Sequence, residues 1–196
     1  RGPAPECVAY LEVMKDRKTK QQVHVTKKIM QEFLSECRTL KEQVFFSLLY
    51  DTGARKGEIV SLQIKHIGRD EYANYVELNG KTGYRKNYLH DSLAWYLPYV
   101  NGLSNNPEHY LFPGSRGPQG HVFVKVPTTW CRQIVRRLKK RGILGPTDKL
   151  TPQGFRHTKN RNLKNKGWSS DKLNLWMGWT ANSNMSTYYG TARAED

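Results

Sequence analysis

The spacing of apolar residues changes twice along this chain, and this change is the strongest constraint on its fold. From Val23 to Leu40, and again from Leu40 to Tyr50, apolar residues recur at helical spacing. Tyr72–Leu78 is instead aromatic and β-branched, and Tyr84–His90 alternates with basic residues. Asn79–Gly83, between them, contains two glycines, a pattern typical of a β-hairpin. Helical spacing then returns, so the chain is predicted to form an α+β domain that is mainly helical with one small antiparallel sheet.

Capping signals help to place the helices. Thr26 stands before the first apolar repeat and Thr151 stands before Pro152, so each threonine is a predicted N-cap. A loop rich in Gly, Pro and Asn is expected from Asn101 to Gly120. The length of 196 residues fits one domain. We place that domain at 23–196, after a linker or the end of a preceding segment at 1–22. Further helices are expected at Glu58–Ile67, Ser92–Val100, Val126–Arg141, Thr151–Lys166, Ser170–Met177 and Asn184–Tyr189.

The charge of the chain points to a polyanionic partner. It has 32 Lys and Arg against 17 Asp and Glu, a formal net charge of +15. Solubility needs only about 2–8 charges, so the excess favours a nucleic acid partner. A basic surface that interacts only with solvent is the alternative. The predicted helix Val126–Arg141 carries a dense group of cations that we expect to follow a DNA backbone: Arg132, Arg136, Arg137, Lys139, Lys140 and Arg141.

Several other classes of protein are not expected from the sequence. No apolar run approaches the ~18 residues of a membrane span, and Arg1–Glu6 contains no apolar signal segment. Cys7, Cys37 and Cys131 are odd in number and far apart, which indicates reduced thiols and neither a disulfide framework nor a zinc site. We therefore expect a cytoplasmic protein with no metal, no cofactor and no membrane partner.

Two short segments place a cation beside glycine. Arg55 and Glu58 lie one helical turn apart just after Gly53, and arginine binds phosphate through two parallel hydrogen bonds. Lys81 lies in the predicted hairpin turn Asn79–Gly83, where glycines let a backbone approach a ligand closely. Taken alone, the first segment is also typical of a surface ion pair and the second of an exposed turn lysine.

Two further segments lie near the end of the chain. The first opens a predicted helix with polar side chains, and the free N–H groups of a helix N-terminus favour phosphate. The second ends in a pair of tyrosines, and tyrosine is among the recognised covalent catalysts. A capped helix with a polar face and a pair of core aromatics would leave the same patterns. The residues concerned are Gln153, Arg156, His157, Trp179, Tyr188 and Tyr189.

In their order and spacing, these segments resemble the boxes of the tyrosine recombinases, the phage-integrase family. That family carries an arginine box T-G-x-R-x-x-E, a hairpin lysine, an H-x-x-R-H box, a G-[HW] pair and a tyrosine shortly after it. The resemblance extends from about Val23 to Gly190, and the stretch GWTANSNMSTYY is most similar to integrases of archaeal viruses or plasmids. The chain reads TGARKGE at 52–58, GKTG at 80–83, PQGFRH at 152–157, GW at 178–179 and YY at 188–189.

The resemblance implies a mechanism that needs neither metal nor ATP. Two guanidinium groups would hold the non-bridging oxygens of the scissile phosphate, where charge grows in the transition state. The hairpin lysine would protonate the leaving 5′ oxygen, and an indole N–H would bond to the phosphate. A tyrosine would attack phosphorus, forming a 3′-phosphotyrosine that keeps the energy of the phosphodiester for rejoining. The residues in these roles would be Arg55 and Arg156, Lys81, Trp179 and the tyrosine, with Glu58 and His157 supporting the site.

The sequence allows two interpretations at each of two positions. Gln153 stands where the family box begins with histidine, and an amide can donate a hydrogen bond but cannot exchange a proton at neutral pH. Either Lys81 and His157 then take more of the acid–base work, or the enzyme is slow. Counting from the Gly-Trp pair favours Tyr188, whereas the S-x-M-x-x-x-Y spacing favours Tyr189. We predict Tyr189 as the nucleophile, with Tyr188 as the alternative.

The predicted function is site-specific recombination of double-stranded DNA by the integrase of a virus or other mobile element, acting as a multimer. A type IB topoisomerase would share the chemistry but relax supercoils as a monomer. A catalytically impaired DNA-binding relative would form no covalent adduct. The family usually carries an N-terminal helical domain that closes around DNA, and the segment 1–22 is too short for one. We therefore expect such a domain to lie upstream, and the protein to act on DNA in the cytoplasm of the host cell.

Overall fold

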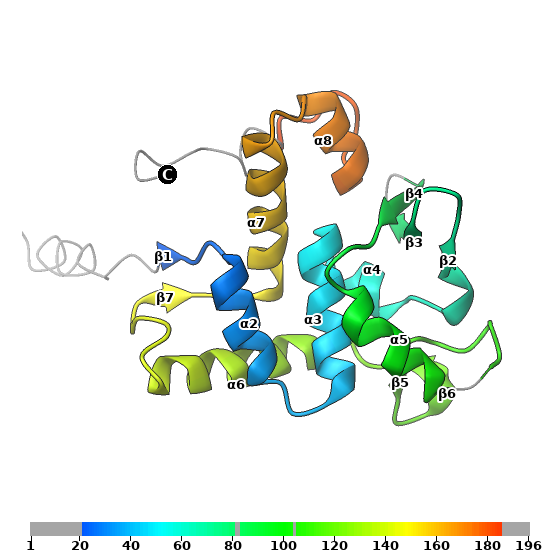
Figure 1. The fold of residues 1–196 in the computed structure, drawn as a ribbon, viewed down its shortest axis with the longest axis horizontal. Coiled ribbons are helices and arrows are strands. Elements are labelled where there is room, and N and C mark those ends of the chain that lie inside the picture. The colour runs from blue at the N-terminus through cyan, green and yellow to red at the C-terminus, as the bar shows by residue number, and fades with distance from the viewer. Residues whose placement is uncertain (1–20, 81–82, 104, 186–196) are drawn as a thin grey trace, which may run out of the picture.

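The computed structural model describes residues 21–80, 83–103 and 105–185, and in this part of the chain seven α-helices are joined by three small sheets (Figure 1). The sheets are β1 with β7, the three strands β2, β3 and β4, and β5 with β6. The helices are α2 (Lys27–Ser35), α3 (Leu40–Thr52), α4 (Lys56–Val60), α5 (Leu93–Asn101), α6 (Val126–Lys140), α7 (Pro152–Asn165) and α8 (Ser170–Met177). The strands are β1 (Gln21–Gln22), β2 (Ile67–Arg69), β3 (Asn74–Gly80), β4 (Gly83–Tyr88), β5 (Pro113–Gly114), β6 (Gly117–His121) and β7 (Asp148–Lys149).

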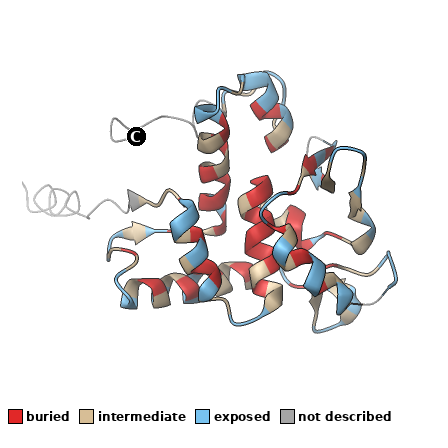
Figure 2. Ribbon diagram, viewed as in Figure 1, coloured by how far each residue is buried: buried red, intermediate tan, exposed pale blue. Residues whose placement is uncertain are grey.

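The helix α3 lies at the centre of the domain, and Figure 2 shows it buried along most of its length. Its apolar residues are spread around the whole helix, a pattern that requires cover on every side. The hydroxyl of Thr39 caps its start by accepting a hydrogen bond from the Glu42 amide at 3.2 Å. It ends at Gly53, whose φ of 66° is left-handed. This centre fixes the position of Gly53, which borders the candidate site.

Phenylalanine side chains tie the other helices to α3. Phe33 of α2 lies edge-on to Phe46 of α3 at 4.8 Å and to Phe155 of α7 at 5.2 Å between ring centroids. Phe45 makes a similar contact with Phe112, just before β5, at 5.3 Å. Each such pair adds about 0.5–1.5 kcal/mol beyond the burial of its area. α2, α3 and α7 therefore share one core, whereas Leu173 and Met177 of α8 form a second, smaller cluster with Leu163 of α7.

The predicted hairpin is confirmed, within two residues at its ends. β3 and β4 pair in antiparallel register from Tyr75↔Tyr88 to Gly80↔Gly83. Lys81, between the last pair, lies outside the described residues. β2 adds a third strand that the sequence pattern did not reveal, because it is only three residues long and begins at the last residue of the predicted helix Glu58–Ile67.

That helix is a wrong prediction. α4 ends at Val60, and the chain continues through a 3₁₀ turn at Ile64–His66 into β2. The reason is tertiary: the carbonyl of Leu62 accepts a hydrogen bond from Leu111 at 2.8 Å, and Gln63 forms a β-bridge with Tyr110. A backbone that pairs with a distant segment cannot continue the helix, although its apolar spacing is helical.

The predicted loop from Asn101 to Gly120 also contains more order than expected. Within it, β5 and β6 pair across a tight turn with the register Gly114↔Gly117. Gly117 has a φ of 80°, which only glycine adopts without strain. Glycine and proline correctly indicate the turns here, but the two short strands could not be predicted because these residues are rare in strands.

The remaining helices follow the sequence closely. The Thr26 hydroxyl accepts from Ile29 N at 3.3 Å, as predicted for an N-cap. Thr151 has the extended backbone of an N-cap before Pro152, although its side chain does not bond to the helix. The predicted Ser170–Met177 matches α8, and most of the predicted Asn184–Tyr189 falls outside the described residues.

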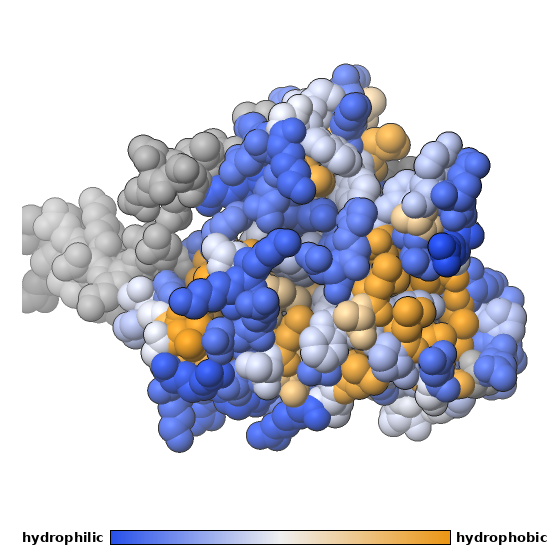
Figure 3. All heavy atoms as spheres, viewed as in Figure 1, coloured by the Kyte–Doolittle hydropathy of each residue, from blue (hydrophilic) through white to orange (hydrophobic). Residues whose placement is uncertain are grey.

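The first described residues lie against the domain, since β1 pairs in parallel with β7. The boundary that we predict at residue 22 stays a prediction. In Figure 3, hydrophobic residues gather mainly over α5 and its surroundings, where Leu97 is 55% exposed. Within the described residues, the helices are too short or too polar to span a membrane.

Candidate functional site

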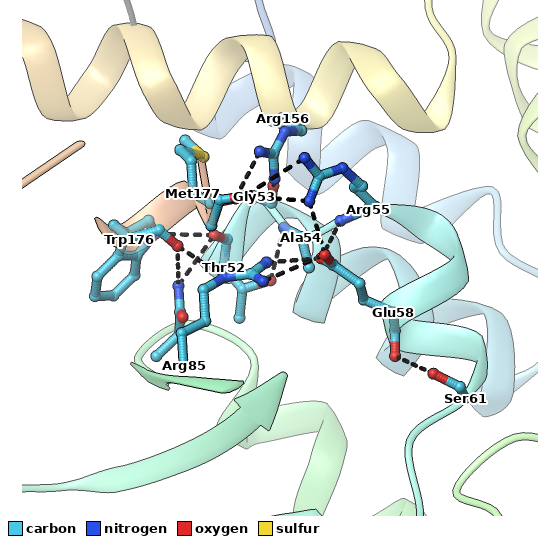
Figure 4. Close-up of polar contacts among 12 residues, drawn as sticks. Thr52, Gly53, Ala54, Arg55, Glu58, Ser61, Arg85, Arg156, Trp176 and Met177 are labelled. Atoms are coloured by element: carbon cyan, nitrogen blue, oxygen red, sulfur yellow. Dashed lines mark hydrogen bonds and ion pairs between the residues drawn. The ribbon is translucent and has the colours of Figure 1, made fainter. Parts of the chain in front are cut away.

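Two helices end close together at the centre of the candidate site, α3 at Gly53 and α8 at Gly178. The last carbonyls of a helix lack partners inside it, and this end carries the negative pole of the helix dipole. Side chains supply the missing donors. The Trp176 indole N–H donates to the Thr52 carbonyl at 2.9 Å, and the Asn87 amide donates to the Trp176 carbonyl at 3.2 Å (Figure 4). The site is thus built on two negative helix ends, which favour nearby cations.

Arg55 and Glu58 bracket the start of α4, as the sequence predicted. Arg55 is the N-cap, and its backbone N–H donates to Glu58 Oε2 at 2.8 Å. Its Nη1 donates to Glu58 Oε1 at 2.9 Å. The side chain of Arg55 is 38% exposed and that of Glu58 only 6%. The pair therefore presents one cation to solvent, held by a carboxylate behind it.

Arg85 on β4 is a member of the site that sequence reasoning missed. Its Nη2 lies 2.6 Å from Glu58 Oε2, its Nη1 lies 3.2 Å from Glu58 Oε1, and its Nε donates to the Trp176 carbonyl at 3.0 Å. One signal was available in the sequence. Side chains alternate between the two faces of a strand, so Arg85 lies on the same face as Leu89, four residues later, and that face is buried. A buried basic residue in a strand usually indicates a paired partner.

Glu58 is held ionised by these contacts. Burial alone would raise the pKa of its carboxyl group, but the hydrogen bonds and charge of Arg85, together with the hydrogen bonds from Arg55, lower the pKa below its ordinary value. Arg156 is the third guanidinium of this cluster, which Figure 4 draws around Gly53. Arg55 and Arg85 bond to the Glu58 carboxylate, whereas Arg156 bonds to the carbonyls of Gly53 and Met177. Three guanidinium groups thus lie near one carboxylate, and the resulting net positive charge suits an anion such as phosphate.

Arg156 is almost fully buried, although the sequence predicted that it contacts the scissile phosphate. It is 1% exposed, and it donates to the Gly53 carbonyl at 2.9 Å and to the Met177 carbonyl at 2.6 Å. Its guanidinium also lies 4.9 Å from the ring centroid of Trp179, a cation–π contact. The structure therefore brings Arg156 and Trp179 together and joins them to the ends of α3 and α8.

A cavity of about 590 Å³ opens beside this cluster. It lies between α4, the end of the β3–β4 hairpin, the start of α6 and the start of α7. Gln153 is exposed here on the first turn of α7. Arg156 and Trp179 are not among the residues that line the cavity. The lining residues include Arg55, Lys56, Glu58, Gly80, Thr128 and Gln153.

A second cavity of about 520 Å³ adjoins the first along α6. The two share Thr128, Thr151 and Pro152, so they form a continuous depression. The second reaches Arg132 and Lys149. A surface of this length and charge is suited to an extended anionic ligand.

The predicted DNA-binding cations of α6 divide into two groups. Arg132, Arg136 and Lys140 are exposed. The other three bind the protein itself: Arg137 pairs with Glu36 at 3.0 Å, Arg141 pairs with Glu32 and Glu36 at 2.9 and 2.7 Å, and Lys139 donates to the Pro146 carbonyl at 2.8 Å. This second group joins α6 to α2 and to the loop after α6.

His157 is half-buried on α7 beside Arg156. Burial lowers its pKa, and the positive charge of Arg156 lowers it further, so the imidazole is neutral at physiological pH. Lys81, Tyr188 and Tyr189 lie outside the described residues. Within the described ranges, no cluster of three or more His, Cys, Asp or Glu side chains could hold a metal ion.

Comparison with known proteins identifies the family of the chain. The sequence matches the phage integrase family over residues 19–195, and the chain therefore belongs to this family. It is 27% identical over 176 residues to a probable integrase/recombinase protein of Methanocaldococcus jannaschii, an alignment that covers 87% of this chain and 52% of that protein. The family that the sequence resembles is thus confirmed.

Solved structures confirm the fold class. The crystal structure of XerA recombinase is similar with a TM-score of 0.70 and 18% identity, covering 92% of this chain and 62% of that chain. A crystal structure of a lambda integrase dimer bound to a COC′ core site has a TM-score of 0.65 and 18% identity, covering 94% of this chain and 53% of that chain. The chain thus spans about half to two-thirds of the length of these relatives.

Proposed function

We propose that this chain is the catalytic domain of a site-specific DNA recombinase that cuts and rejoins DNA through a covalent 3′-phosphotyrosine. The observation that carries the proposal is a pair of guanidinium groups beside a cavity that Arg55 lines: Arg55 is held by Glu58, and Arg156 is held by the carbonyls of Gly53 and Met177. Membership of the phage integrase family supports the same chemistry.

Arg55 is the residue assigned to contact the scissile phosphate directly, since it combines partial exposure with a fixed position. Arg156 adds a second guanidinium in a buried environment, where charge acts on an anion more strongly than it does in water. Trp179 is held beside the Arg156 guanidinium by its cation–π contact. Because these groups are already oriented by helix ends, little reorganisation is needed as charge grows on the phosphate oxygens.

Tyr189 is assigned the attack on phosphorus, with Tyr188 as the alternative. The P–O bond to the tyrosine oxygen forms as the bond to the 5′ oxygen breaks, and Lys81 donates a proton to that leaving oxygen. Gln153 lines the cavity and can donate a hydrogen bond to the phosphate, but it cannot accept the proton of the tyrosine. His157, whose neutral imidazole can accept a proton, is the described residue best suited to that task.

The continuous depression from Arg55 to Lys149 is the proposed path of double-stranded DNA past the site. Arg132, Arg136 and Lys140 would neutralise flanking phosphates, whereas the remaining cations of α6 hold the domain together. Recombination on paired sites also implies self-association on DNA. We further propose that a DNA-clamping domain lies outside this chain. The protein would act on DNA in the cytoplasm of the host cell, and it would originate from a virus or other mobile element.

The test is a trapping experiment with nicked DNA duplexes of randomised sequence, in which the short strand beyond the cut diffuses away and leaves the protein attached. We expect an adduct that resists SDS with the wild type and with Tyr188→Phe, and none with Tyr189→Phe. Loss in Tyr188→Phe alone would assign the nucleophile to Tyr188. Relaxation of supercoiled plasmid by monomers would support a topoisomerase, and no adduct at all would support an impaired relative.

A further inference from the structure

Arg85 has no place in the mechanism above, yet it is among the most constrained cations of the described residues. Its side chain is 4% exposed on β4. A buried guanidinium is costly unless its charge and hydrogen bonds are matched. Arg85 meets this condition with two nitrogens on the two Glu58 oxygens and with its Nε on the Trp176 carbonyl. This geometry holds Glu58 in one orientation.

Glu58 also serves Arg55, so its charge is divided. Each carboxylate oxygen accepts from both arginines: Oε1 from the two Nη1 atoms at 2.9 and 3.2 Å, and Oε2 from the Arg55 amide at 2.8 Å and from Arg85 Nη2 at 2.6 Å. Arg85 is the deeply buried partner and Arg55 the exposed one. The negative charge of Glu58 is therefore balanced from behind by Arg85, and the charge of Arg55 is left for a ligand in the cavity.

Two glycines pack closely against Arg85 and Glu58. Gly178 has a φ of 63°, and a Cβ at that position would lie 2.6 Å from Arg85 Nη1. A Cβ on Gly80 would lie 2.6 Å from Glu58 Oε1 and 3.3 Å from Arg85 Nη1. Two glycines thus make room for this ion pair, one from the hairpin and one from the end of α8.

We propose that Arg85 is a positioning residue of the recombinase site: it neutralises and orients Glu58, so that the Arg55 guanidinium stays directed toward the scissile phosphate. This inference rests on the proposed function. Without Arg85, Glu58 would have only Arg55 to balance its charge, and Arg55 would be drawn back from the cavity. A lysine at this position would keep the positive charge that neutralises Glu58 but would lose part of the fork that orients it.

The test compares Arg85→Gln, Arg85→Lys and the control Lys86→Gln, which removes an exposed cation from the neighbouring residue of the same strand. Cleavage of the trapped nicked duplex is measured in single turnovers, together with affinity for an uncut duplex and thermal unfolding. Loss of one charged hydrogen-bonding partner predicts cleavage roughly 10–100-fold slower in Arg85→Gln. Affinity should change less than about 3-fold, because most phosphate contacts lie elsewhere. Arg85→Lys, which keeps the charge but not the fork, should cleave faster than Arg85→Gln, and Lys86→Gln should cleave like the wild type.

The proposal is overturned if Arg85→Gln cleaves like the wild type, if Arg85→Lys is as slow as Arg85→Gln, or if affinity falls in step with the rate. If Arg85→Gln does not fold, the cleavage rate of Arg85→Lys tests the proposal alone, because this variant keeps the charge. A folded Arg85→Lys protein that cleaves more than about 100-fold slower than the wild type contradicts the role. A wild type that forms no adduct refutes the proposed function instead, so the two failures are distinguishable.

Discussion

Replacement of Gly178 by alanine tests the packing of the site in a quantitative way. Gly178→Ala and Gly167→Ala both place a methyl group on a left-handed backbone, with φ of 63° and 79°. Each should cost about 1–2 kcal/mol for that conformation, and the effect of alanine on the unfolded chain is common to both. The surroundings differ: a Cβ at Gly167 meets nothing within 4 Å, whereas a Cβ at Gly178 lies 2.6 Å from Arg85 Nη1.

The difference between the two variants therefore isolates the displacement of Arg85. Its guanidinium is fixed by three hydrogen bonds, so it can move away only by losing at least one of them. A hydrogen bond to a charged group contributes about 1.5–3 kcal/mol. We expect urea unfolding, followed by circular dichroism, to show Gly178→Ala less stable than Gly167→Ala by about this amount. Equal stabilities would mean that Arg85 is not held beneath Gly178.

Three further predictions concern other parts of the domain. The pKa of His157 is lower in the folded protein than in the unfolded chain, so the unfolded chain binds the proton more strongly. The stability that depends on neutral His157 is complete above about pH 6.5 and is lost as the pH falls below that value. His157→Gln should therefore flatten the decline of the unfolding free energy between about pH 7 and 5.5. Arg132→Ala should lower the slope of log DNA affinity against log salt by about one, whereas Arg141→Ala, which breaks pairs with α2, should lower the unfolding midpoint and leave that slope unchanged. Thr158→Val should cost about 1–3 kcal/mol in urea unfolding because the buried Val25 amide loses its acceptor at 3.0 Å, and Thr158→Ser should cost less.

The sequence predicted the elements whose signals are local. Thr26 caps α2 and Gly53 ends α3, because capping depends on neighbouring residues alone. The pairing of Arg55 with Glu58 was visible for the same reason, since the two residues lie on one helical turn. The order of the family boxes likewise predicted that Arg156 and Trp179 belong to the same site.

What the sequence did not predict depends on distant pairing. The helix expected over Glu58–Ile67 stops early because Leu62 bonds to Leu111, which lies far along the chain. Arg85 joins the site only because the β3–β4 hairpin packs beside α4 and the end of α8. The deep burial of Arg156 likewise follows from the meeting of two helix ends. In these cases the spacing of residues along the chain carries no information about the partner.

The product that defines the proposed mechanism is DNA covalently attached to Tyr189. The trapped adduct can be digested with nuclease and protease, and the peptide that carries the residual nucleotide can be sequenced by mass spectrometry. We predict a nucleotide joined through its 3′ phosphate to the Tyr189 oxygen. A nucleotide on Tyr188 would contradict that assignment, and a nucleotide joined through a 5′ phosphate or carried by a residue other than these tyrosines would contradict the mechanism itself.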